Sequence, residues 1–91
     1  MATRASVDQH INRAEEACKY ALEQLEVANQ QEHYNTTEYI DAQMMLNESY
    51  MELQKLMLSS NKQQKERLYR MQLQINRIQN DMILDQQNLL M

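Results

Sequence analysis

The chain has 91 residues, a net charge of −4 at pH 7, and no glycine, proline, tryptophan or phenylalanine. A chain of this length forms one small domain, with too little buried surface for both a core and a deep substrate cleft. Most of its residue types favour helices and few are β-branched, so the composition predicts an all-α fold. The lack of glycine also excludes the glycine-rich loops that hold phosphates and dinucleotides.

The opening residues, MATRASVDQH, lack the apolar run of a secretion signal, and no segment is apolar for long enough to cross a bilayer. The single cysteine, Cys18, can form no internal disulfide, which suits a reducing compartment. We therefore expect a cytoplasmic protein with no membrane partner.

The first predicted helix covers residues 7–29. Ser6 and Gln9 have the spacing of a capping box, in which each side chain bonds to the other residue's backbone N–H. Apolar and small residues then recur in steps of four and three, which places them on one helix face. This stripe consists of Val7, Ile11, Ala14, Cys18, Ala21, Leu25 and Ala28.

The second and third predicted helices cover residues 36–58 and 62–85. Asn35 and Glu38 have capping-box spacing at the start of the second. Its stripe is Tyr39, Ala42, Leu46, Ser49, Leu53 and Leu56, and that of the third is Leu68, Met71, Ile75, Ile78 and Met82. The third stripe meets a polar Asp85, and we expect the tail, residues 86–91, to fray.

The segment KLMLSSNKQQKE decides whether the chain turns between the last two helices. If one helix ran through, the phase of the second stripe would predict core positions one residue before the apolar ones observed. This one-residue shift in the phase of the apolar stripe coincides with Ser59, Ser60 and Asn61, which favour caps and turns. The pairs Asn61–Gln64 and Ser60–Gln63 also have the spacing of capping boxes. We predict an antiparallel three-helix bundle. The alternative is a helical hairpin whose long second helix dimerises as a coiled coil.

Two segments, QEHYNTTEYIDAQMML and LQKLMLSSNKQQKERLYRMQLQINRIQNDMIL, together with the opening MATRASVD, resemble the YtzC-like family of short proteins from Bacillus and its relatives. The likeness covers nearly the whole chain. The family is a domain of unknown function with no assigned activity, cofactor or catalytic residue. The resemblance therefore implies a cytosolic bacterial protein and transfers no site residue.

No group of residues in the sequence indicates an enzyme, a metal site or a cofactor site. His10 and Cys18 are eight residues apart on one helix, too far to share an ion, and His33 lies in a loop. Cys18 lies in the apolar stripe, where a thiol behaves as a small hydrophobic group. The carboxylates fall mostly on solvent-facing positions without a partner base.

The segment from His33 to Tyr39, HYNTTEY, gathers hydrogen-bonding groups and two rings around one loop. Such a cluster could bind a small polar ligand or a peptide. Helix capping by Asn35 and Glu38, with Tyr34 packed onto the first turn, explains most of the same residues, and we favour it.

Charge is unevenly distributed along the chain. Residues 1–54 carry a net charge of −7, and residues 55–91 carry +3. Attraction between the acidic and basic helices is the simplest explanation. The alternative function is weak nucleic-acid binding by a basic edge formed by Lys62, Lys65, Arg67 and Arg70, although no recognition motif accompanies it.

Eight methionines include Met44, Met45 and Met51, which cannot all face one narrow stripe. Met44 and Met51 could contribute to an adaptable apolar surface that binds a partner. The alternative is that Met45 widens the core and Met44 and Met51 are isolated surface apolar groups, which are common. The function that fits best is a non-catalytic helical protein-interaction module, an adaptor or regulator, whose partner is another protein or a second copy.

Overall fold

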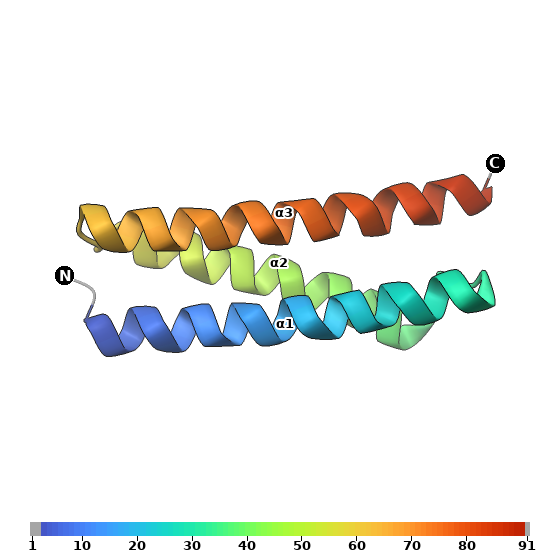
Figure 1. Cartoon of the computed structure of the whole chain (residues 1–91), viewed down its shortest axis with the longest axis horizontal. Helices are drawn as coiled ribbons and strands as arrows, with labels where there is room; N and C mark the ends of the chain where they lie inside the picture. Colours follow the sequence, from blue (N-terminus) through green and yellow to red (C-terminus); the bar gives the residue numbers. More distant parts are fainter. Residues whose placement is uncertain (1–2, 91) are drawn as a thin grey trace.

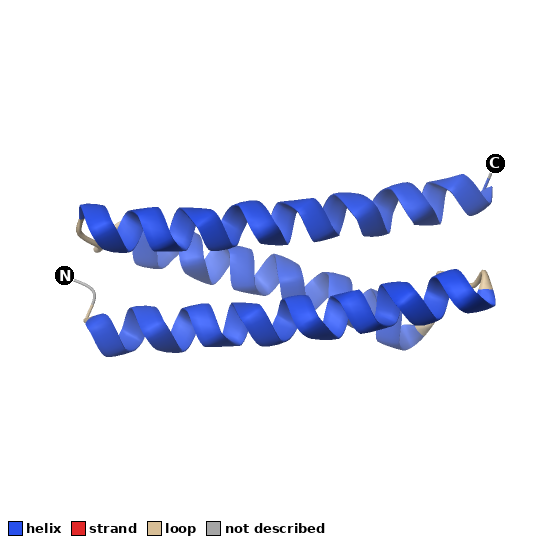
Figure 2. Ribbon diagram, in the orientation of Figure 1, coloured by secondary structure: helices blue, strands red, loops and turns tan. Residues whose placement is uncertain are grey.

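The computed structural model describes the backbone of residues 3–90 and the side chains of residues 3–86. Its helices are α1 (Arg4–Gln31), α2 (Thr37–Met57) and α3 (Lys62–Leu90). They run up, down and up, so α1 and α3 point the same way and α2 lies behind them (Figure 1). Each helix packs against the other two, and the described residues contain no strand (Figure 2). The predicted three-helix bundle is confirmed.

The start of α1 differs from the predicted capping box. Thr3 has an extended backbone and its Oγ1 accepts a hydrogen bond from the Ser6 N–H at 3.0 Å. Thr3 is thus the N-cap, and the expected cap at Ser6 with Gln9 is wrong. The reason is that Ser6 already lies in the first turn, where its own N–H needs an acceptor.

The loop between α1 and α2 contains no glycine, and other residues end α1 and begin α2. Glu32 adopts the left-handed conformation (φ 53°, ψ 39°), and the backbone N–H groups of Glu32 and His33 both bond to the Ala28 carbonyl. A longer side chain thus occupies a position that usually selects glycine or asparagine. Thr36 then caps α2 by accepting from the Tyr39 N–H at 3.1 Å, so the cap predicted at Asn35 is wrong by one residue.

The turn between α2 and α3 follows the predicted chemistry closely. Asn61 and Gln64 form a reciprocal capping box, with both side-chain to backbone hydrogen bonds at 2.9 Å. The Ser60 hydroxyl donates to the Leu56 carbonyl at 2.6 Å and so helps to end α2, and it does not cap α3. The chain therefore turns at residues 58–61 and does not continue as one helix.

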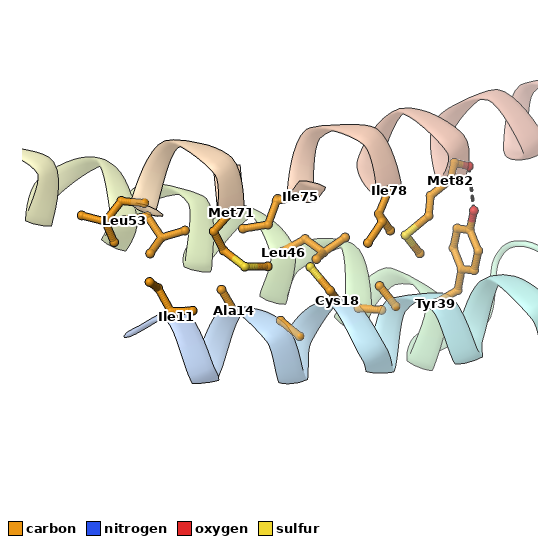
Figure 3. Packing of buried hydrophobic residues seen from close by; sticks show 14 of the residues in the cluster. Ile11, Ala14, Cys18, Tyr39, Leu46, Leu53, Met71, Ile75, Ile78 and Met82 are labelled. Carbon is orange, nitrogen blue, oxygen red and sulfur yellow. Dashed lines mark hydrogen bonds between the residues drawn. The ribbon is translucent and has the colours of Figure 1, made fainter. Parts of the chain in front are cut away.

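The core runs the length of the bundle between the three helices (Figure 3). It contains nearly all of the three predicted stripes, with Leu25 and Leu56 partly buried at its margin. Ala17 adds a further small residue on α1, where a narrow side chain lets α2 approach closely. The buried apolar residues are Val7, Ile11, Ala14, Ala17, Cys18, Ala21, Ala28, Tyr39, Ala42, Leu46, Leu53, Leu68, Met71, Ile75, Ile78 and Met82.

Two polar contacts fix the height of α2 against α3. The Tyr39 hydroxyl donates to the Met82 carbonyl at 2.6 Å inside the core (Figure 3). Gln72, only 4% exposed, donates its amide to Gln54 Oε1 at 2.9 Å and to the Tyr50 carbonyl at 3.4 Å. Because a buried amide or hydroxyl without a partner is costly, sliding one helix past the other would be penalised.

The end of α3 lies beyond the predicted one. The helix continues to Leu90, five residues past residue 85, so most of the tail expected to fray is helical. Met91 and the side chains of residues 87–90 lie outside the described part of the chain.

Burial perturbs two ionisable groups of the core. Desolvation, with a smaller contribution from the Glu15 charge, raises the pKa of the Cys18 thiol from 9.0 to about 11. Desolvation, followed by the charges of Asp85 and Tyr34, raises the pKa of Tyr39 from 10.0 to about 12. Both groups are therefore neutral in the folded protein at neutral pH.

We expect Asn61→Ala to lower the free energy of unfolding by about 1 kcal/mol, because it removes the cap of α3. Urea denaturation followed by circular dichroism measures the change. Asn12→Ala, at an exposed position within α1, is the matched control and should cost nothing, since alanine is the better helix former. Equal losses in both variants would contradict the role of the cap.

We also expect stability to fall as the pH rises above about 9. The unfolded chain releases the Cys18 proton at its ordinary pKa, whereas the folded protein retains it up to a pH of about 11. The thiol's contribution is thus complete below pH 9 and declines by up to about 1.4 kcal/mol per pH unit above it. Tyr39 adds a similar decline from pH 10 to about 12.

Urea denaturation at pH values from 8 to 10 tests this linkage. Cys18→Ala should be less stable at pH 8 because it loses core packing, but its stability should fall less steeply up to pH 10. The same pH dependence in both proteins would show that the thiol is not responsible.

Candidate interaction surface

Two of the three seams between helices are shallow hollows bordered by charge. The seam between α1 and α2 is lined by Arg13, Glu16, Met45, Glu48 and Glu52, among others. The seam between α1 and α3 holds two adjoining hollows, which share Arg70 and Gln74. These hollows mix arginines and carboxylates with apolar groups, and Leu22 and Leu73 line one of the two between α1 and α3.

The third side of the bundle, between α2 and α3, carries most of the exposed large apolar side chains. By helical periodicity, positions 40, 44 and 51 of α2 and position 58, which follows its last residue, lie on this side. Positions 69, 73 and 83 of α3 lie on the same side. We call this surface the α2/α3 face. It consists of Ile40, Met44, Met51, Leu58, Tyr69, Leu73 and Ile83, all of them exposed.

Exposed apolar groups are concentrated on this face. It carries seven of the eleven large hydrophobic side chains that are exposed in the described part of the chain. Met44 and Met51, the two residues predicted to form a partner surface, are each 56% exposed and lie seven residues apart on the same side of α2. Apolar groups that gather on one face indicate a binding surface more strongly than scattered ones.

Both edges of the α2/α3 face carry charges of both signs. Periodicity places Asp41, Glu48, Glu52 and Lys55 along the far edge of α2, and Glu48 and Glu52 also line the seam with α1. Along the far edge of α3, Arg70 and Arg77 share a hollow with Asp81, and Arg70 is paired with Glu66. The exposed apolar side chains of the face thus lie between two edges of mixed charge.

The four residues of the predicted basic edge do not lie in one row. Arg67 donates to Asp8 at 2.8 Å, and Arg70 donates to Glu66 at 2.7 Å. Lys65 and Arg67 are about 160° apart around α3, so Lys62 and Lys65 lie on the other side of the helix from Arg67. Arg67 joins α1 to α3, as expected if charge helps to pair the helices.

The side chains of the loop from His33 to Tyr39 are used largely within the fold. The Tyr34 ring packs edge-on against Tyr39, with centroids 5.6 Å apart, and its hydroxyl donates to Asn29 Oδ1. Gln86 donates to the Tyr34 carbonyl at 3.2 Å and so ties the loop to α3. Partial burial, together with the charges of Asp85 and Glu32, raises the pKa of Tyr34.

Among the described residues, no three histidine, cysteine or acidic side chains lie close enough together to hold a metal ion. Cys18 is buried in the core, whereas His33 is exposed in the loop. No helix in the described range combines the length and apolar character that a membrane span requires.

Met44 and Met51 of this face were named from the sequence, whereas Ile40, Leu58 and the residues on α3 were missed. Tyr69, Leu73 and Ile83 are exposed apolar residues whose spacing of four and ten repeats that of one helix side. Their periodicity was a usable signal, but the stronger stripe of buried residues on the opposite side of the same helix obscured it. Gln72 carried no signal, because glutamine is ordinarily a surface residue.

The chain is similar to proteins of a known family to which no activity is assigned. A family model described as a protein of unknown function (DUF2524) matches residues 1–84. The uncharacterized protein YtzC of Bacillus subtilis (strain 168) is 57% identical over 84 residues, which cover 92% of this chain and 93% of that protein. No solved structure matches the chain. The resemblance predicted from the sequence is confirmed, and the chain belongs to the DUF2524 family.

Proposed function

We propose that the protein is a non-catalytic protein-interaction module whose binding surface is the α2/α3 face. The observation that carries the proposal is the concentration of exposed apolar side chains there, with Met44 and Met51 each 56% exposed. Burying such groups against a partner is the main favourable term in protein association.

The shape and chemistry of the face favour a helical partner. Two antiparallel helices present a shallow furrow between them, into which the apolar side of another helix can pack. The flexible thioethers of Met44 and Met51 adapt to the partner's side chains at little cost in strain. We propose that such a module acts as an adaptor or regulator.

Photo-crosslinking through methionine tests the proposal. Cells grown with photo-methionine should give crosslinks from Met44 and Met51 to a second polypeptide, whereas Met71 and Met82, which are buried, should crosslink within the chain. The double variant Ile40→Lys/Leu58→Lys keeps both methionines, and it should lose their intermolecular crosslinks and keep its helicity, because both positions are exposed.

Asn12→Lys/Val27→Lys is the matched control, since it introduces two lysines at exposed positions of α1 that lie off the face. It should retain the crosslinks. If no intermolecular crosslink forms from Met44 or Met51, or if both double variants lose it equally, the α2/α3 face is not the binding surface.

A further inference from the structure

We propose that the α2/α3 face binds an amphipathic helix of another protein that carries acidic residues beside its apolar side. The inference rests on the function proposed above and names the chemistry of the partner of that same face. Three lysines support it, and they lie where the turn between α2 and α3 closes the face. We call Lys55, Lys62 and Lys65 the lysine end of the face.

Both helices of the face contribute to the lysine end. Lys55 lies one helical turn beyond Met51 on α2. On α3, Lys65 and Lys62 lie one and two turns before Tyr69. The short turn joins the two helices at this point, so the lysine of α2 lies within about two helical turns of those of α3. All three lysines are exposed, and they therefore make this end of the face basic.

The carboxylates of the fold leave the lysine end without ion pairs among the described residues. Its nearest acidic residues in sequence are Glu52 and Glu66. Glu52 lines the seam between α1 and α2, and Glu66 accepts from Arg70 at 2.7 Å. Glu48 lies about two turns from Lys55, toward the other end of the face. The positive charge of the three lysines is thus available to a partner.

Two of the lysines oppose the helix that carries them. Lys62 is the first residue of α3 and Lys65 is the fourth, and the first turn contains no acidic residue. The N-terminal end of a helix carries a partial positive charge, so cations there lower the stability of the helix. Residues placed against a local rule of folding are expected at functional sites, and these two positions therefore indicate a role in binding.

The apolar residues beside the lysines favour a protein helix over a nucleic acid. Met51 and Leu58, which are 56% and 84% exposed, gain from burial against other apolar side chains, and a phosphate backbone offers none. Proteins that bind single strands stack successive bases on aromatic side chains, whereas Tyr69 is the one aromatic residue of the α2/α3 face. An amphipathic helix supplies both an apolar side for the furrow and acidic residues for the lysines.

Titration of the isotope-labelled full chain with two synthetic peptides, followed by NMR, tests the inference. Both peptides form helices of about 18 residues with the same leucine side, which is flanked by glutamates in one peptide and by lysines in the other. The glutamate peptide should shift the amide signals of residues 51–69 and bind at least about ten times more tightly, because three contacts change from repulsion to attraction. Equal affinities, or tighter binding of the lysine peptide, would overturn an acidic partner.

Lys62→Glu separates binding from folding. It should raise the dissociation constant of the glutamate peptide about five-fold, since one attraction becomes a repulsion. Its midpoint of urea denaturation should not fall, because a carboxylate in the first turn of a helix is favourable. Lys19→Glu is the matched control, with the same charge change at an exposed position of α1 off the face, and it should bind like the wild type. An equal loss of affinity in both variants would show that the lysine end is not the contact.

Single-stranded RNA and vesicles that contain anionic lipid are the competing probes. If either shifts the signals of the lysine end at lower concentration than the glutamate peptide does, a helical protein partner is overturned. Weaker binding of both probes is the expected result.

The photo-methionine experiment distinguishes a failure of this inference from a failure of the proposed function. Crosslinks from Met44 and Met51 that Lys62→Glu leaves unchanged would preserve the binding surface and overturn the acidic partner. Crosslinks that join two copies of this chain would overturn another protein as the partner. The absence of intermolecular crosslinks would overturn the proposed function and this inference with it.

Discussion

The reciprocal hydrogen bonds between Asn61 and Gln64 are the constraint on which this architecture depends. They satisfy backbone N–H groups that a newly started helix leaves without partners, and so they make it favourable for α3 to begin at Lys62. Without that start, the two stripes on either side of the turn would belong to one long helix with its apolar phase displaced. Because the chain turns there, the residues before and after the turn form two separate helices, and the apolar stripes of both face one core.

The absence of glycine shapes both loops in ways that follow from backbone sterics. Glu32 takes the left-handed conformation at the end of α1, at a cost of about 1 kcal/mol for a residue with a β-carbon. Its backbone bonds to Ala28 help to offset that cost. The second turn avoids the problem, because Ser60 and Asn61 supply their own side-chain hydrogen bonds.

Much of the fold could be predicted because the helix period dominates this sequence. The stripe from Val7 to Ala28 and the stripe from Leu68 to Met82 are regular enough to place the core. The N-caps of α1 and α2 were harder to predict, because several neighbouring residues have side chains that can cap a helix. These residues are Thr3, Ser6, Asn35 and Thr36, and only the backbone geometry distinguishes them. On the candidate surface, Met44 and Met51 were identifiable, because apolar groups off a buried stripe must face solvent. The α3 half depended on which sides of the two helices come together, and that is set by tertiary packing.

The buried polar contacts link the core to the outer surface. Gln72 and Tyr39 hold α2 and α3 at one relative height, and a slide of one turn, about 5.4 Å, would leave their polar atoms without partners. The same height determines which charged residues on the outer edges are level with one another. A polar residue within an otherwise apolar core thus specifies a register at some cost in stability, as single polar positions do in coiled coils. The pattern of charge at the edges of the α2/α3 face is therefore a consequence of hydrogen bonds made beneath it.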